Sequence, residues 1–150
     1  MTTLRFTCYG LPRPQGSTRA FVVKGRAVTT SDTADLKPWR ASLADAGREA
    51  MADLGEQIWD GPVHVSATFT LPRPKSRPKR DRWPDRKPDI DKLARALLDG
   101  LTGPVVTDDA QVCVLTVGQF YVGDPLALLE PGVIVAVNRL GDKTPTAMDA

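Results

Sequence analysis

The sequence predicts an α+β fold: a single domain with a mixed or antiparallel sheet and about two helices packed on one face. Its 150 residues correspond to one domain, and 41% hydrophobic and 25% charged residues are ordinary globular values. Apolar and polar residues alternate over 62–71, which is the period of a half-buried strand. Apolar residues recur at threes and fours over 37–54 and 89–101, which is the period of an amphipathic helix.

The strands are predicted from short apolar segments that end at glycine, proline or polar turn residues. Two of these segments flank Lys24-Gly25-Arg26 and predict a hairpin. The run Thr107-Asp108-Asp109 predicts a turn that leads into a long strand. The predicted strands are residues 4–9, 20–23, 27–30, 62–71, 111–122 and 133–137.

The two predicted helices differ in how well their ends are marked. Gly55 provides a stop for the helix at 37–54. The helix at 89–101 has the clearest apolar stripe in the chain, Asp89 is a good N-cap residue, and Gly103 lies just past the end.

We expect residues 1–140 to form the domain and residues 141–150 to be a polar, flexible tail. Cys8 and Cys113 lie in apolar stretches without CxxC spacing, which predicts buried thiols in a reducing compartment. The start of the chain lacks the pattern of a signal peptide, and the apolar run 133–137 is too short to cross a bilayer. We therefore expect a cytoplasmic protein.

A concentrated basic segment, which we call the basic loop, spans residues 72–88. It carries a net charge of +6 although the whole chain carries +2, so the rest of the chain is mildly acidic. Its five prolines exclude a helix and predict a long extended loop. Such a charge distribution indicates a polyanionic partner, the alternative being a mobile solubilising segment. Trp83 within it either stacks on an unpaired base or packs locally.

Acidic residues follow the basic loop directly. With Asp89 at the N-cap, its carboxylate and that of Asp91 can converge ahead of the helix. The turn at Asp108-Asp109 lets the chain fold back, so that a third carboxylate can return to the helix N-terminus. Three clustered carboxylates repel one another, and a divalent cation resolves that conflict. Oxygen ligands without histidine or cysteine select Mg²⁺ or Mn²⁺, and a metal beside a polyanion-binding loop suits phosphodiester hydrolysis.

These acidic residues also have a structural interpretation. Asp89 is an ordinary helix cap, and adjacent aspartates at 108–109 suit a turn. Asp91, Arg95 and Asp99 follow one another at i, i+4 spacing and can form a solvated charge ladder.

Three segments of the chain form a recognisable set of motifs: Pro88-Asp89-Ile90-Asp91-Lys92-Leu93, Leu97-Leu98-Asp99-Gly100-Leu101-Thr102-Gly103 and Asp108-Asp109-Ala110-Gln111-Val112. They resemble the RusA family of Holliday-junction resolvases, whose pattern is Asp-x-Asp-Asn-Leu-x-Lys, a Leu-Asp-Ala-Leu stretch and Asp-Asp-x-Gln-Val. The loop Gly-Leu-Pro-Arg-Pro-Gln-Gly-Ser at 10–17 is similar to the family as well.

The resemblance implies a homodimeric, Mg²⁺-dependent endonuclease of bacterial or phage origin that cuts four-way DNA junctions with paired nicks. Mn²⁺ is a possible substitute. The implied catalytic acids and metal ligands are Asp89, Asp91 and Asp109. Two positions depart from the family: Lys92 replaces its Asn, and Arg95 replaces its catalytic Lys. Arg95 keeps the charge for phosphate but cannot transfer a proton.

The predicted function is therefore a junction-resolving endodeoxyribonuclease acting in DNA recombination and repair. The first rival is a non-catalytic, architectural DNA-binding protein whose aspartates are structural, and the second is a metal-dependent hydrolase of small phosphate compounds. His64 is the only histidine, which argues against zinc and Ser–His hydrolysis. The predicted DNA-binding residues are Arg73, Lys75, Arg77, Lys79, Arg80, Arg82, Arg86, Lys87 and Lys92.

Overall fold

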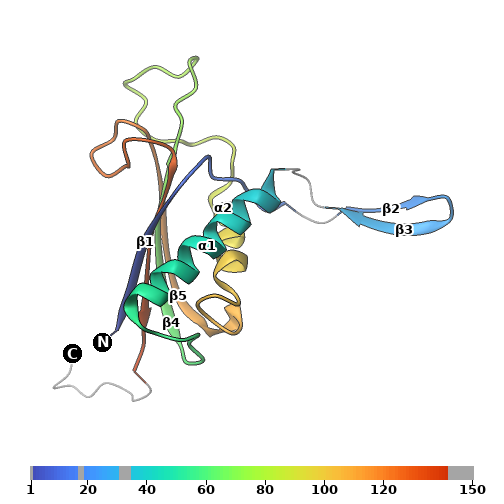
Figure 1. Ribbon diagram of the computed structural model, residues 1–150. Helices are drawn as coiled ribbons and strands as arrows, with labels where there is room; N and C mark the ends of the chain where they lie inside the picture. Colours follow the sequence, from blue (N-terminus) through green and yellow to red (C-terminus); the bar gives the residue numbers. More distant parts are fainter. Residues whose placement is uncertain (1, 17–18, 31–34, 142–150) are drawn as a thin grey trace.

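The computed structural model describes residues 2–16, 19–30 and 35–141, with the backbone alone described at 19–23 and 26–30. A four-stranded sheet has the order β1-β6-β4-β5, and α1 and α2 pack together on one face of it (Figure 1). A separate two-stranded sheet pairs β2 with β3. The predicted α+β fold, its mixed sheet and its two helices are confirmed. The elements are β1 (Thr3–Tyr9), β2 (Arg19–Val23), β3 (Arg26–Thr30), α1 (Leu36–Leu54), β4 (Val63–Leu71), α2 (Ile90–Leu101), a 3₁₀ turn (Asp109–Gln111), β5 (Val112–Tyr121) and β6 (Gly132–Arg139).

The sheet is mixed because β4 has neighbours of both directions. It pairs antiparallel with β6 and parallel with β5. A parallel neighbour needs a crossover connection, and here that connection contains the basic loop and α2. The crossover therefore starts at one end of the sheet with Leu71 and returns to the other with Val112, which brings the basic loop and the N-terminus of α2 to the end of the sheet where β4 stops.

The core lies between the sheet and the two helices. The alternate residues of β4 that were predicted to face inward, from Val63 to Leu71, are all buried. Leu93, Leu97 and Leu101 of α2 are fully buried, as the apolar stripe predicts. Burying one leucine side chain contributes about 1.5–3 kcal/mol, so this stripe holds α2 firmly on the sheet.

The two helices approach closely at Gly100. A Cβ atom at this position would lie 2.9 Å from the Cβ of Leu43 on α1, a distance that real side chains do not adopt. The glycine that interrupts the otherwise favourable helix sequence is therefore explained by the packing of α1 on α2. The last turn of α2, including Asp99, is held against α1 as a result.

The prediction that both cysteines are buried is half wrong. Cys8 is buried on β1, and desolvation raises the pKa of its thiol. Cys113 is exposed, because β5 is an edge strand and its first half has little cover. The predicted tail lies, from residue 142 on, outside the described residues. Among the described helices none is both long and apolar enough to span a bilayer.

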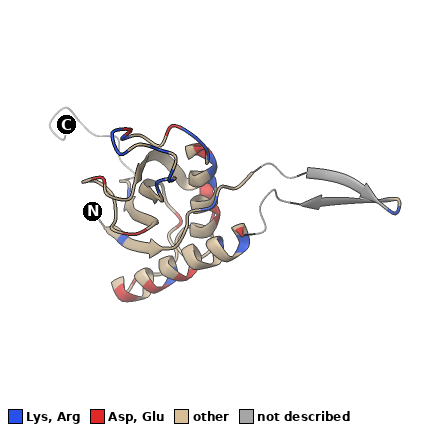
Figure 2. Ribbon diagram, turned by 90° about the horizontal axis from the view of Figure 1, so that it is seen from above, with Lys and Arg blue, Asp and Glu red and all other residues tan. Residues whose placement is uncertain are grey.

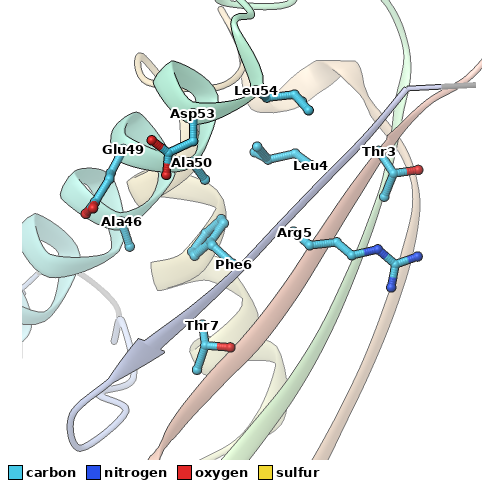
Figure 3. Close-up of a pocket in the computed structure, with 10 residues that line it drawn as sticks. All are labelled: Thr3, Leu4, Arg5, Phe6, Thr7, Ala46, Glu49, Ala50, Asp53 and Leu54. Atoms are coloured by element: carbon cyan, nitrogen blue, oxygen red, sulfur yellow. The ribbon is translucent and has the colours of Figure 1, made fainter.

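A groove of about 520 Å³ runs between β1 and α1. Figure 3 shows Phe6 pointing from β1 toward the helix, with Glu49 and Asp53 along its rim and Arg5 on the other side of the strand. This groove contains none of the predicted catalytic or basic-loop residues. It is therefore set apart from the site described below.

Candidate functional site

The basic loop is ordered by three of its own arginines. Arg73 donates to the carbonyl oxygens of Pro78 (2.8 Å) and Asp81 (2.7 Å). Its guanidinium also stacks on the ring of Tyr121, 4.6 Å from the ring centre. These contacts close the first half of the loop onto the end of β5.

Arg77 forms the centre of the loop. Its Nη2 donates to the carbonyl oxygen of Trp83 (3.0 Å) and to Asp85 (2.8 Å), and its side chain is only 10% exposed. Hydrogen bonding and the charge of Asp85 outweigh desolvation and raise the pKa of Arg77. The loop itself therefore uses this guanidinium, and the predicted contact of Arg77 with DNA stays a prediction.

Arg82 fixes the far end of the loop to the β5–β6 connection. Its Nε donates to Asp124 at 2.8 Å, and the hydrogen bond lowers the pKa of that carboxyl. Trp83 is 56% exposed and packs against Phe120, with the Arg82 guanidinium over its ring. Gln119 of β5 donates to the carbonyl oxygen of Pro84 at 2.8 Å, which anchors the segment that enters α2.

The remaining cations of the basic loop are exposed to solvent. They project from a backbone that the contacts above hold in place, and in Figure 2 the blue segments of the loop lie beside the acidic residues of α2. These exposed residues are Lys75, Lys79, Arg80, Arg86 and Lys87.

Asp89 and Asp91 line one open hollow of about 610 Å³ at the start of α2, together with Gln119 and residues 84–88. Asp89 is the N-cap residue by its backbone, yet its side chain makes no capping hydrogen bond. Its carboxylate instead contacts Lys87 at 3.0 Å and Lys92 at 3.8 Å. The hydrogen bond from Lys87 is the main cause of its lowered pKa.

The N-terminal loop, residues 10–16, contacts this site through a backbone hydrogen bond. The amide of Gln15 donates to the carbonyl oxygen of Lys92 in the first turn of α2 at 3.0 Å. The Gln15 side chain accepts from Arg40, which also lies 3.7 Å from Asp99. The resemblance at 10–17 thus has a structural basis, although nothing in the sequence singled out Gln15 or Arg40.

Asp109 lies elsewhere, in a hollow between the ends of α1 and α2 that it shares with Asp99, Lys37 and Arg40. Desolvation, hydrogen bonding with Asp108 and the charges of Asp108 and Asp99 raise its pKa, in that order. Within the described residues, no three acidic, histidine or cysteine side chains form a metal-binding group. The structure brings Asp89 and Asp91 together and leaves Asp109 beside Asp99.

The proposed charge ladder along α2 does not form. Asp91 and Arg95 are both exposed and make no ion pair within the described part of the chain, whereas Asp99 pairs with Arg40. The carboxylate of Asp91 and the guanidinium of Arg95 are therefore available to a ligand.

Comparison with known proteins identifies the family. The sequence model of the family described as Endodeoxyribonuclease RusA matches residues 12–137, which is most of the chain. The chain belongs to the RusA family of endodeoxyribonucleases. RusA enzymes cut DNA at Holliday junctions, so membership confirms the suspected resemblance and the prediction of a DNA-cutting enzyme.

A curated relative of this RusA chain is the uncharacterized protein YqaN of Bacillus subtilis (strain 168). The two are 30% identical over 135 residues, which cover 83% of this chain and 92% of YqaN. The similarity thus extends over most of the length of both proteins.

Proposed function

We propose that this RusA-family chain is a Mg²⁺-dependent, structure-selective endonuclease that resolves four-way DNA junctions by paired nicks. It acts as a homodimer in DNA recombination and repair. The observation that carries the proposal is the position of the ordered basic loop, which runs directly into the hollow that contains Asp89 and Asp91.

The exposed cations of the basic loop bind the DNA backbone. Phosphate contacts position the protein on DNA without reading its sequence, which suits an enzyme that selects a shape. Arg73, Arg77 and Arg82 hold the loop in one conformation, so the exposed cations between them are positioned for phosphate before DNA binds. Lys92, half-buried beside Asp89, adds a cation at the start of α2.

The residues around Asp89 fit a hard divalent cation. Mg²⁺ is usually bound through one or two carboxylates with water and substrate phosphate, and Asp89 and Asp91 supply two such carboxylates in one open hollow. A metal bound there would supply an activated water and charge stabilisation for the leaving oxygen. Mn²⁺ is compatible with the same oxygen ligands.

The other side chains of the site act through charge. Lys87 and Lys92 neutralise Asp89 and so limit its repulsion of an approaching phosphate. Arg95 contacts phosphate without taking part in proton transfer. We assign Asp109 the role of a third acid in its own hollow beside Asp99, apart from the hollow of Asp89 and Asp91. Desolvation, and then Asp108 and Asp99, raise its pKa and favour a bound cation or a proton there.

The homodimer is supported by the edge strand β5. Its ten residues, Val112–Tyr121, contain neither a charged residue nor a proline, and exposed Val114 and Leu115 lie in its first half. Edge strands without such residues are templates for pairing with another chain. A second copy, paired antiparallel about a two-fold axis, would extend the sheet and provide the two equivalent sites that paired nicks require.

A synthetic four-way junction tests the function. We expect paired nicks in Mg²⁺, no cutting in EDTA, and little cutting of a linear duplex with the same sequence. Cutting that persists in EDTA would exclude the metal mechanism. Binding without cutting in Mg²⁺ and in Mn²⁺ would favour the architectural alternative.

A further inference from the structure

A further hollow, of about 330 Å³, lies beside the segment that enters α2. Its walls come from the N-terminal loop, the two ends of the basic loop and Tyr121 at the end of β5. Six prolines line it and supply flat, apolar surfaces between its charged side chains. We call it the proline pocket, after Pro12, Pro14, Pro72, Pro74, Pro84 and Pro88.

Contacts within and around its walls hold the proline pocket open. The hydrogen bond from Gln15 to Lys92 fixes the N-terminal loop on α2. Arg73 stacks on Tyr121, and Gln119 donates to the carbonyl oxygen of Pro84, so both ends of the basic loop are tied to β5. A largely preformed apolar hollow with a few polar groups is typical of a ligand site.

The polar groups around the pocket suit a planar ligand that carries a phosphate. Arg13, Arg86 and Lys87 line it and supply positive charge. Arg77 also lines it, and its Nε–H is buried without an acceptor among the described residues. The two apolar faces of a nucleobase can pack against proline rings, and the acceptor atoms at its edge can accept a hydrogen bond from such a donor.

The pocket also lies next to the acidic site. Arg86, Lys87 and Pro88 line both the proline pocket and the hollow of Asp89 and Asp91. A nucleotide whose phosphate lies in the acidic hollow thus has its own base, or that of its neighbour, within reach of the proline pocket.

We propose that the proline pocket binds an unstacked nucleobase of the strand being cut, adjacent to the cleaved phosphate. This inference rests on the proposed junction-cutting function and adds a reason for its selectivity. Unstacking a base costs least where the helix is already interrupted, as at a junction crossover, and most inside a linear duplex. The pocket therefore favours branched DNA over duplex before any bond is cut.

Fluorescence of 2-aminopurine tests the proposal without relying on cleavage. The probe replaces, one at a time, each base flanking the cut site, and the junction is bound in EDTA. The fluorescence should rise at one position on binding, because the base leaves the stack. Ser76→Trp fills the pocket from an exposed position, and Ser42→Trp is the matched control on exposed α1.

We expect Ser76→Trp to abolish the fluorescence rise and to weaken binding of the junction about tenfold, which is the scale of one lost base contact. Ser42→Trp should change neither. Titration with a free deoxynucleoside monophosphate tests whether the pocket binds free nucleotides as well as nucleotides of a DNA strand. Weak binding that Ser76→Trp removes would show that it also binds the free nucleotide.

No fluorescence rise at any position, in a protein that binds and cuts junctions normally, would overturn the base pocket and leave the proposed function intact. An equal rise in wild type and Ser76→Trp would overturn it as well. A rise that Ser76→Trp abolishes, in a protein that never cuts, would support the pocket while the catalytic proposal fails.

Discussion

The carboxylate of Asp89 accepts a hydrogen bond from the ammonium group of Lys87 at 3.1 Å. The last cation of the basic loop is thus paired with the first acid of α2, and Lys92 approaches the same carboxylate from within the helix. A divalent cation that binds Asp89 has to compete with these two lysines. Under the proposed function, both DNA contact and metal affinity therefore depend on Lys87.

Replacing Lys87 should separate these two effects. In Lys87→Gln the pKa of Asp89 should move back up toward its ordinary value, and half-maximal cleavage should need less Mg²⁺, because one competing cation is gone. Binding should weaken, with the logarithmic salt slope falling by about 0.9 if one phosphate contact is lost. Single-turnover cleavage over a Mg²⁺ series and affinity over a salt series measure the two. Lys75→Gln, an exposed change away from Asp89, is the control. An unchanged Mg²⁺ requirement in Lys87→Gln would argue against competition.

Arg77 and Lys79 should respond differently to the same substitution. Arg77→Ala removes the bonds to Trp83 and Asp85, so the loop should lose its order and become sensitive to trypsin. Lys79→Ala should leave the loop resistant and reduce the salt slope of DNA binding by about 0.9. Limited proteolysis and salt titration distinguish them. Equal resistance of both variants would show that Arg77 does not organise the loop.

The Arg82–Asp124 pair predicts a specific pH dependence of stability. The hydrogen bond from Arg82 lowers the pKa of Asp124 below the unfolded value of about 3.9, so the pair stabilises the fold above that value. This contribution is lost as the pH falls through the lowered pKa. Asp124→Asn should therefore have a lower Tm than wild type at pH 5, and the difference should shrink toward pH 2. Asp60→Asn, an exposed change, is the control, and a difference that stays constant with pH would contradict the assignment.

Periodicity was sufficient to predict most of the fold. The apolar stripe that contains Leu93 and Leu97 predicts a helix with that side toward the core, and the alternation over 62–71 predicts a strand with one buried face. Each pattern therefore predicts both the type of element and the side of it that is buried. Cys113 was misplaced because the apolar start of β5 has no alternation. Only the strand order, which leaves β5 at an edge, decides which of its residues are exposed.

The site was predictable in its residue types and less so in its geometry. Charge and spacing predicted that Asp89 and Asp91 lie close together, and the two line one hollow; their role in catalysis stays a prediction. They could not show that Arg77 is used inside the loop, since its partners are mainly backbone carbonyls and Asp85. Nor could they place Asp109, because the turn after α2 leaves it beside Asp99 and not at the N-terminus of the helix.

Pairing through β5 predicts a selective effect of charge on assembly. Val114→Lys places a cation on the uncovered edge strand, within the proposed interface, and should shift the protein from dimer to monomer. Ile134→Lys is the matched control, because Ile134 is similarly exposed (40% against 45%) but lies on β6 between two strands. Sedimentation velocity measures both. A dimer that survives Val114→Lys would locate the interface elsewhere, and a wild-type protein that stays monomeric on a junction would contradict the homodimer.

The most direct test of the central claim compares four variants on one four-way junction. Affinity is measured in EDTA and single-turnover cleavage in Mg²⁺ for Asp89→Asn, Asp91→Asn, Asp109→Asn and the α1 control Asp53→Asn. Each site variant removes one negative charge with little change in shape, and Asp89→Asn and Asp91→Asn also each remove one oxygen of the proposed metal site. We predict that cleavage falls by about 100-fold or more in the three site variants, that their affinity is kept or increased, and that Asp53→Asn behaves as wild type. Near-normal cleavage by both Asp91→Asn and Asp109→Asn would contradict the metal site and leave these residues as parts of a helix and a turn.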